Sequence, residues 1–523
     1  TSLGTFVYRV DNDAVTELNL LGNAGLIRSI GDIYGIILLP ASATGNDIEQ
    51  ARKLLIDRGA SDAVSASSVQ QFWQSRNDIV EFKQVDASSV TSFREGWRFC
   101  ASLEIFPPLQ APNCINFLNA WEGNSSLNSF GAIDASSGTT FSSAWKSCSS
   151  LTSFPAGAKL GTEASGVNFS QAWKSSGLTS FSTPLPTATT LTSTWQQCTS
   201  LTSFSTELPT ATRVDYAWWG DNSLSDFRTT DIKNSTNFTS AWQNCSALSS
   251  FPADAKLGTS AQNVNFTSAW QASGLTSFPD LDLSNGNTFT NAWRDSSLSS
   301  FGSNTQLGTN SQNVDFVNAW FNTGLTSFPA LDLSNGINFS AAWYSTPNLT
   351  SFPSGAKLGT EATNVNFTSA WESSGLTSFP ALDLSTANNF TSAWRSCTGL
   401  MSFPLLDTSA GANFSYAWFG CTGLMSFPLL DTSAGTTFFA AWYGCTGLTS
   451  FPLLNSNKVS GFGYAWYGCT GLTSFPASFF DSWNPSSIAT GVFNLTWDGC
   501  TSLTAQSVEN ILTSIDASGP YAP

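Results

Sequence analysis

The chain has 523 residues, and only 11% of them are charged, whereas soluble domains average about 25%. It contains no histidine, which excludes Ser/His/Asp and Cys/His nucleophile arrangements, imidazole general bases and every metal site that needs histidine. The formal net charge of −16 would repel phosphates, so nucleic acid is not an expected partner.

Charged residues are concentrated at the N-terminal end. Residues 1–88 contain 18 of them, out of 20 basic and 36 acidic residues in the whole chain. This step in composition predicts a small α/β head over residues 1–88. We expect strands at residues 5–10 and 33–39 and helices at residues 48–57 and 67–76. The head is expected to cap the first repeat and to contact other virion or surface subunits.

Tryptophan organises the rest of the chain, because it recurs seventeen times at intervals of 22 to 31 residues. We predict about seventeen coils of about 24 residues, which together span residues 89–503. The tryptophans of the repeat are Trp97, Trp121, Trp145, Trp173, Trp195, Trp218, Trp242, Trp270, Trp293, Trp320, Trp343, Trp371, Trp394, Trp418, Trp442, Trp466 and Trp497.

Each coil is predicted to contain one short strand, a polar return loop and one helical turn. The strand is the Leu-x-x-Phe segment, which ends at Pro or Ser. Phe, Ala and Trp follow at spacings that place them on one side of a helical turn. Ordering 24 residues costs more free energy than the apolar side chains of one coil return, so the coils must stack.

The C-terminal segment, residues 504–523, is predicted to close the repeat. Residues 507–512 have the pattern of a short amphipathic helix that covers the last coil. No run of 18 apolar residues predicts a membrane span, and residues 1–6 lack the basic and apolar regions of a signal peptide. We therefore expect no membrane insertion.

The repeat unit, exemplified by Trp418, Cys421, Leu424 and Phe427, resembles the cysteine-containing leucine-rich repeats of BspA-like and mycoplasma-type surface proteins. Ala-Trp stands here where that family has Met-Phe. The resemblance implies an α/β solenoid, a right-handed leucine-rich-repeat-like superhelix of about 17 coils with short parallel strands. It also implies surface display and adhesion. Trp-rich versions are similar to repeats in fibre or particle-surface proteins of marine bacteriophages.

Nine of the ten cysteines lie three residues after a repeat tryptophan, and Cys114 is the exception. Their spacing of about 24 residues is not a metal or redox signature, so we interpret them as small buried thiols rather than a disulfide ladder. Asn-x-Ser/Thr sequons recur because Asn-Phe-Thr/Ser belongs to the repeat, which makes glycosylation an unsafe inference. We expect no metal and no cofactor.

Four coils with a longer interval carry an insertion that begins at Lys159, Lys256, Gln306 or Lys357. Each insertion reads Lys/Gln-Leu-Gly-Thr, and the coil after it lacks the repeat cysteine. Two interpretations remain open. The insertion is either a packing variant that fills space left in the next coil, or a ridge that binds a partner through Lys159, Lys256 and Lys357.

The residue directly after the repeat tryptophan is aromatic in six coils. A side chain at this position turns away from the repeat tryptophan, so we predict a stacked aromatic stripe that binds sugar faces or a receptor loop. The alternative is lateral packing between coils. The six residues are Trp219, Phe321, Tyr344, Phe419, Tyr443 and Tyr467.

These features predict a non-enzymatic protein of a virion surface or extracellular cell surface that recognises a host glycan or protein receptor. One alternative is a structural homo-oligomer that assembles into a fibre, sheath or decoration layer. Another is a polysaccharide depolymerase, which needs two carboxylates about 5 to 9.5 Å apart. Only scattered acids such as Asp215, Asp221 and Asp226 are available for that chemistry.

Overall fold

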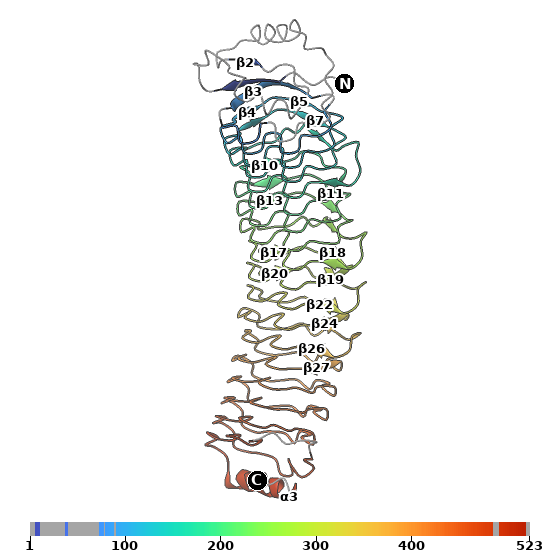
Figure 1. Cartoon of the computed structure of the whole chain (residues 1–523). Helices are drawn as coiled ribbons and strands as arrows, with labels where there is room; N and C mark the ends of the chain where they lie inside the picture. The colour runs from blue at the N-terminus through green and yellow to red at the C-terminus, as the bar shows by residue number, and fades with distance from the viewer. Residues whose placement is uncertain are drawn as a thin grey trace. The chain divides into compact units, whose positions relative to one another are not determined.

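The computed structural model describes residues 6–10, 37–39, 73–77, 79–87, 90–484 and 491–518. It forms two units, Thr1–Leu248 with Ala255–Leu257, and Ser249–Asp254 with Gly258–Pro523. In both units the chain winds in successive turns whose short strands pair in parallel (Figure 1). The parallel repeat solenoid expected from the sequence is therefore confirmed within each unit.

Each turn contributes up to three short strands, and the first is the expected segment that ends on the buried Phe. Within the first unit, for example, Phe181 pairs in register with Phe204. Proline follows this Phe in many turns and ends the strand because it has no N–H to donate. This first column contains β4 (Ile105–Phe106), β6 (Ser129–Phe130), β10 (Ser180–Phe181), β12 (Ser203–Phe204), β13 (Asp226–Phe227), β17 (Ser277–Phe278) and β20 (Ser300–Phe301).

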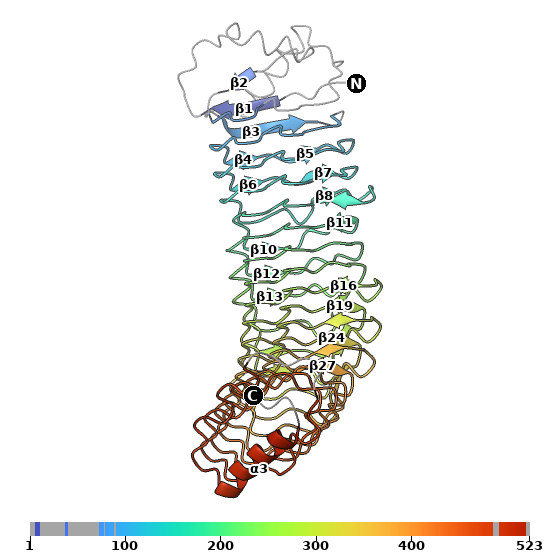
Figure 2. The same cartoon turned by 60° about the horizontal axis from the view of Figure 1, so that its bottom comes forward.

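Two further columns of strands were not predicted. In the first unit the first two columns lie along one sheet, because β3 pairs with both β4 and β5 (Figure 2). The second column contains β5 (Leu109–Gln110), β7 (Ile133–Ala135), β8 (Lys159–Leu160), β14 (Asp231–Ile232), β15 (Lys256–Leu257), β18 (Asp282–Leu283), β21 (Gln306–Leu307), β23 (Asp332–Leu333) and β25 (Lys357–Leu358). The third contains β9 (Val167–Asn168), β11 (Ala188–Thr190), β16 (Val264–Asn265), β19 (Gly286–Thr288), β22 (Val314–Asp315), β24 (Gly336–Asn338), β26 (Val365–Asn366) and β27 (Ala387–Asn389).

At the N-terminal end, β1 (Phe6–Val10) pairs in parallel with β2 (Ile37–Leu39) and antiparallel to β3 (Ile79–Asp86). β3 in turn pairs in parallel with β4 and β5, so the two expected head strands continue the sheet of the first unit. The expected helix at residues 48–57 lies outside the described residues. Of the helix expected at residues 67–76, the described end is a turn with a positive φ at Ser75, which a right-handed helix does not allow.

Trp73 packs as a repeat tryptophan, although it lies before the boundary expected at residue 88. Its ring centroid is 5.3 Å from that of Trp97, with an angle of 3° between the planes. Its backbone N–H donates to the carbonyl of Gly96, as the backbone N–H of Trp97 donates to the carbonyl of Ala120. The stack of turns therefore includes residues on the N-terminal side of residue 88.

A column of stacked tryptophans forms the centre of each unit. Successive indole rings are 5.2 to 5.8 Å apart between centroids and within 7° of parallel. The Phe of the first strand column packs edge-on against these rings, as Phe403 does against Trp394 and Trp418. All seventeen tryptophans expected to mark the coils belong to these two columns.

The segment around the repeat tryptophan is not the helical turn that we predicted. Ser392 and Ser396, on either side of Trp394, both have positive φ, at 55° and 58°. As a result the N–H of Ser392 and the N–H of Trp394 donate to carbonyls of the next turn rather than within their own turn. A right-handed helix would keep these bonds local, whereas stacking requires them between turns. The only helix among the described residues is α3 (Ala505–Ala517).

The repeat cysteines are buried free thiols, as predicted. Each one donates its S–H to the carbonyl of the tryptophan in the preceding turn, as Cys445 does to Trp418 with an Sγ to oxygen distance of 3.2 Å. Burial raises the pKa of Cys148 and of Cys445 to about 12. The repeat thiols therefore serve packing and hydrogen bonding between turns, and Cys148 and Cys445 are poor nucleophiles.

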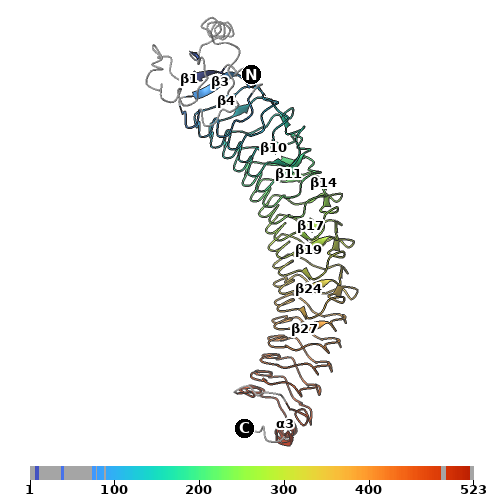
Figure 3. The ribbon, with the colours of Figure 1, turned by 45° about the vertical axis from the view of Figure 1, so that its right-hand side comes forward.

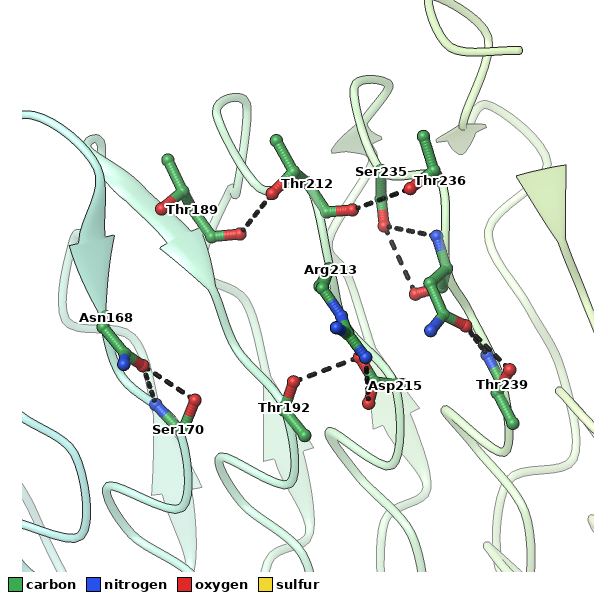
Figure 4. A network of polar contacts seen from close by, with 11 residues as sticks. Asn168, Ser170, Thr189, Thr192, Thr212, Arg213, Asp215, Ser235, Thr236 and Thr239 are labelled. Carbon is green, nitrogen blue, oxygen red and sulfur yellow. Dashed lines mark hydrogen bonds and ion pairs between the residues drawn. The ribbon is translucent and has the colours of Figure 1, made fainter. Parts of the chain in front are cut away.

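The recurring sequons have a local structural role, which Figure 4 shows in the first unit. Oδ1 of Asn168 accepts hydrogen bonds from the backbone N–H and the hydroxyl of Ser170, at 2.8 and 2.7 Å. A second type of bond links neighbouring turns, because the hydroxyl of Thr212 donates to the carbonyl of Thr189 at 3.0 Å. Asn and Thr recur along the chain because they satisfy backbone groups at these bends.

The last turn is covered by α3, which confirms the expected C-terminal helix and is longer than residues 507–512. Thr504 caps its N-terminus by accepting a hydrogen bond from the N–H of Ser507. Ser507 also accepts from the N–H of Phe475, and Ser514 accepts from the N–H of Phe480. Polar side chains of α3 thus satisfy backbone groups that would otherwise have no next turn to bond with.

Candidate binding surface

The aromatic residues that follow a repeat tryptophan are all half-buried at the surface of their turns. Trp219 belongs to the first unit and the other five belong to the second. In the second unit they form two groups, which are Phe321 with Tyr344, and Phe419 with Tyr443 and Tyr467. The sequence therefore predicted one stripe where the structure has two separate groups and one isolated tryptophan.

The predicted stacking is confirmed within both groups. The rings of Phe419 and Tyr443 are 4.5 Å apart between centroids and 8° from parallel. Tyr443 and Tyr467 are 4.8 Å apart and 13° from parallel. Phe321 and Tyr344 are 4.9 Å apart and 1° from parallel. The role of these residues in binding remains a prediction.

Three further aromatic residues, which the sequence analysis did not single out, lie beside the larger group. Tyr416 contacts Phe419 and also Phe439, with centroids 6.0 and 5.4 Å apart. Phe439 contacts Tyr464, and Tyr464 contacts Tyr467, at 5.7 and 5.9 Å. Six half-buried rings thus form a closed circuit of contacts across three turns. We call them the aromatic belt, which consists of Tyr416, Phe419, Phe439, Tyr443, Tyr464 and Tyr467.

The faces of the belt rings are largely occupied by their neighbours. The guanidinium carbon of Arg395 lies 4.9 Å from the ring centroid of Phe419 and 5.8 Å from that of Tyr416. Nε of Arg395 is also 3.7 Å from a carboxylate oxygen of Glu372. Because the rings stack on each other and on Arg395, a ligand would meet ring edges and phenol hydroxyls rather than open ring faces.

Glycine follows the aromatic residue in each of these turns, at Gly420, Gly444 and Gly468, with φ between 67° and 71°. Other turns place serine at the same point, for example Ser373 at φ 58°, so glycine is not required by the backbone alone. A Cβ added to Gly444 would have no heavy atom within 4 Å. The glycines therefore leave a strip without side chains next to the belt.

The same surface position carries charged residues in the first unit. Arg98, Glu122 and Lys146 follow repeat tryptophans of successive turns. Nε of Arg98 and Nζ of Lys146 lie 2.7 and 3.3 Å from the two carboxylate oxygens of Glu122. Neighbouring turns thus contact each other at this position through ion pairs in the first unit and through aromatic stacks in the second.

The lysines of the insertions lie on strands of the second column. Nζ of Lys159 is 3.0 Å from a carboxylate oxygen of Asp134, and Nζ of Lys357 is 2.9 Å from one of Asp332. Lys256 is exposed and is paired in register with Asp231. Each aspartate belongs to the preceding turn, so at least two of the three candidate lysines neutralise a carboxylate of their own chain.

The rest of each insertion is a loop that follows these strands, and Figure 3 shows loops that project near β19 and β24. In the second unit Gly308 and Gly359 have positive φ, at 65° and 67°, and a Cβ there would press against the valine side chain six residues later. Glycine is needed at this tight bend. Exposed residues such as Asn310 and Glu361 follow it, so packing and partner binding both remain open as roles of the insertion.

The acids considered for catalysis serve separate structural contacts. Asp215 pairs with Arg213, and Asp226 pairs with Arg228. Asp221 is fully buried, and burial raises its pKa well above the usual carboxyl range. Across the described ranges, no three Cys, Asp or Glu side chains gather as a metal site, and no helix has the length and apolarity to cross a bilayer.

No protein-family model matches the chain, and no curated protein matches it. Among solved structures, a leucine-rich repeat protein from Bacteroides ovatus is 13% identical, with 81% of this chain and 88% of that chain covered and a TM-score of 0.33. A leucine rich cell surface protein from Faecalibacterium prausnitzii is 14% identical, with 83% and 81% covered and a TM-score of 0.20. The pneumococcal vaccine antigen PcpA is 13% identical, with 79% and 75% covered and a TM-score of 0.22.

Proposed function

We propose that this chain is a non-enzymatic surface protein of a virion or cell, of the BspA-like repeat type, and that it binds a host receptor through the aromatic belt. The observation that carries the proposal is the belt itself. It gathers six half-buried aromatic rings on three successive turns, beside glycines that leave the adjoining strip without side chains. Aromatic side chains of this kind are enriched at binding surfaces.

The arrangement of the rings favours a protein receptor over a bare sugar. Stacking of a sugar needs an open aromatic face, and the faces between Phe419, Tyr443 and Tyr467 are occupied by each other. Ring edges and the hydroxyls of Tyr443 and Tyr467 suit a receptor loop that supplies apolar contacts and hydrogen-bond acceptors. A glycan receptor is the alternative outcome of the experiment below.

The test uses the labelled full chain and a panel of intact bacterial strains. We expect binding to a subset of strains, and we expect the triple variant Phe419→Ser, Tyr443→Ser and Tyr467→Ser to lose at least about tenfold in affinity. Pretreatment of the cells with protease should abolish binding if the receptor is a protein, whereas periodate should abolish it if the receptor is a glycan.

The matched control is Phe321→Ser with Tyr344→Ser, which removes the other aromatic stack of the same unit. It should bind cells as the unchanged protein does. Both variants should retain the near-ultraviolet circular dichroism of the tryptophan columns. Unchanged binding by the folded belt variant would show that the belt is not the receptor site. Belt-dependent assembly of the chain in analytical ultracentrifugation would favour the structural homo-oligomer instead.

A further inference from the structure

A second unusual surface occurs in the second unit, on the segments that follow Trp394, Trp418 and Trp442. Met401, Leu405, Met425, Leu429 and Leu453 have exposed fractions of 52, 66, 55, 62 and 50%. We call these five residues the Met/Leu stripe. An apolar side chain that is half exposed gives up about half of its burial free energy, so five of them on three successive turns indicate a surface that is covered in the functional state.

The stripe is a departure from the repeat rather than part of it. The two methionines are the only ones in the chain, and the same position holds threonine in the flanking turns, at Thr377 and Thr449. The three leucines lie two residues after the buried Phe, where Ala381 and Ala477 stand in the flanking turns. The repeat therefore folds without these apolar side chains, and their presence needs another reason.

The methionines lie on directly adjacent turns. The N–H of Met425 donates to the carbonyl of Met401 at 3.1 Å, and Ser402 pairs in register with Ser426. At about 4.8 Å per turn, Leu405 to Leu453 covers roughly 10 Å along the stack, which matches about two turns of an α-helix. Methionine suits such a surface because its flexible side chain adapts to different partners.

A column of carboxylates borders the stripe. Asp383, Asp407 and Asp431 are exposed on successive turns, and Asp407 lies two residues after Leu405 on the same face. Asp383 and Asp407 are paired in register. Like charges directly opposite each other destabilise a sheet. Elsewhere in this column the chain avoids that cost, because Lys357 of the next turn neutralises Asp332. No described Lys or Arg forms an ion pair with Asp383, Asp407 or Asp431.

We propose that the Met/Leu stripe and the column Asp383, Asp407 and Asp431 form a docking surface for an amphipathic, basic segment of a partner protein. Its apolar side chains would cover the stripe, and its Lys or Arg side chains would neutralise the three carboxylates. The negative charge of this surface favours a basic partner over a second copy of the chain. A second copy of the chain, whose formal net charge is −16, would bring its own carboxylates to the same face.

The surface is tested with a short amphipathic helical peptide of Leu and Lys, by fluorescence anisotropy with the full chain at about 0.15 M salt. A peptide with Glu in place of Lys and a peptide with scrambled leucines are the probe controls. The stripe variant combines Met401→Thr, Met425→Thr, Leu405→Ala, Leu429→Ala and Leu453→Ala, which restores the residues of the flanking turns and leaves every charge in place.

We expect the Leu/Lys peptide to bind the unchanged chain at least about tenfold more tightly than it binds the stripe variant, a difference of about 1.4 kcal/mol. The triple change Asp383→Asn, Asp407→Asn and Asp431→Asn should also weaken binding. The belt variant Phe419→Ser, Tyr443→Ser, Tyr467→Ser should bind the peptide normally, so that failure of the receptor proposal and failure of this one are distinguishable.

Four results would overturn the proposal. These are equal affinity of the stripe variant, equal affinity of the Glu or scrambled peptide, dimers of the unchanged chain that the stripe variant does not form, and stripe-dependent sedimentation with phosphatidylcholine vesicles. The third result would identify a second copy as the occupant, and the fourth a lipid surface.

Discussion

The Sγ atom of Cys421 lies 3.1 Å from the carbonyl oxygen of Trp394 in the preceding turn. The same bond joins every repeat cysteine to the tryptophan one turn earlier, as between Cys397 and Trp371. A thiol is small enough for the buried space beside the tryptophan column and supplies one weak donor. The repeat cysteine is therefore a link between turns.

Replacement of Cys421 by alanine should lower the free energy of unfolding. The carbonyl of Trp394 would lose its S–H donor and keep only the backbone N–H of Cys397, so we expect a cost of about 0.5 to 1.5 kcal/mol. Replacement by serine should cost less, because the position accepts a hydroxyl in other turns, as at Thr346, where the hydroxyl donates to the carbonyl of Trp343 in its own turn. Urea unfolding of the two variants measures the difference, and equal losses would contradict this role of the thiol.

Asp221 should make the stability of the first unit depend on pH. Its Oδ1 accepts a hydrogen bond from the N–H of Cys198 at 2.8 Å, and its Oδ2 has no partner among the described residues. Because burial raises its pKa in the folded state, it stays protonated at pH values where the unfolded chain has ionised. The folded state then binds more protons, so the free energy of unfolding falls as pH rises above about 4, by up to about 1.4 kcal/mol per unit.

The measurement compares the unchanged chain with Asp221→Asn, which keeps the accepting oxygen but does not titrate. We expect the two proteins to be similar in stability near pH 4 and the Asn variant to be more stable at pH 7. Parallel pH profiles of the urea midpoint would mean that Asp221 ionises in the folded state at its ordinary pKa.

Much of the fold follows from the period of the sequence. Positions such as Trp394, Leu400 and Phe403 are buried in nearly every turn, and counting tryptophans alone predicts stacked coils. The bend around Trp394 was not predictable in the same way. Ser392 and Ser396 adopt positive φ, which sequence reasoning assigns to glycine or asparagine. Bonds to the next turn stabilise this conformation, and no local pattern encodes them.

Only half of the aromatic belt could be predicted, because only three of its residues share a fixed spacing from the repeat tryptophan. Phe419, Tyr443 and Tyr467 share one offset from the repeat tryptophan, so they appear as a stripe in the sequence. Tyr416 and Phe439 precede their tryptophans by two and three residues, and the left-handed bend brings them to the same surface. The strand columns two and three escaped prediction because segments of two or three residues show no periodicity.

Two glycines of the second unit should respond differently to alanine. A Cβ at Gly286 would overlap the ring of Phe289, which is completely buried, so Gly286→Ala should cost several kcal/mol through overpacking. Gly444→Ala meets no atom within 4 Å and should cost only about 1 kcal/mol for its positive φ. Thermal unfolding of both variants provides the comparison. A larger loss for Gly444→Ala would show that the strip beside the belt is closely packed.

The three like charges beside the Met/Leu stripe should be a source of instability that one substitution relieves. Asp407→Lys places a cation between Asp383 and Asp431, in the way that Lys357 neutralises Asp332. Because these side chains are exposed, we expect a gain of about 0.5 to 1 kcal/mol at low salt that shrinks as salt is added. Urea midpoints at two salt concentrations measure it, with Asp407→Asn as the control that removes repulsion without adding attraction.

The C-terminal helix should stabilise the last turns of the second unit against local unfolding. The amide of Asn510 donates to the carbonyl of Phe475, and Ser514 accepts from the N–H of Phe480, so α3 takes the place of a further turn. The double change Asn510→Ala and Ser514→Ala leaves these buried backbone groups without partners, at about 1 to 3 kcal/mol each. We expect faster amide exchange at residues 462–480 and unchanged exchange at residues 97–121, measured by hydrogen exchange with mass spectrometry.

The exposed Glu509→Ala change on the same helix is the control. If exchange in the last turns stays slow in the double variant, the end of the solenoid is stable without its helix, and α3 serves another contact.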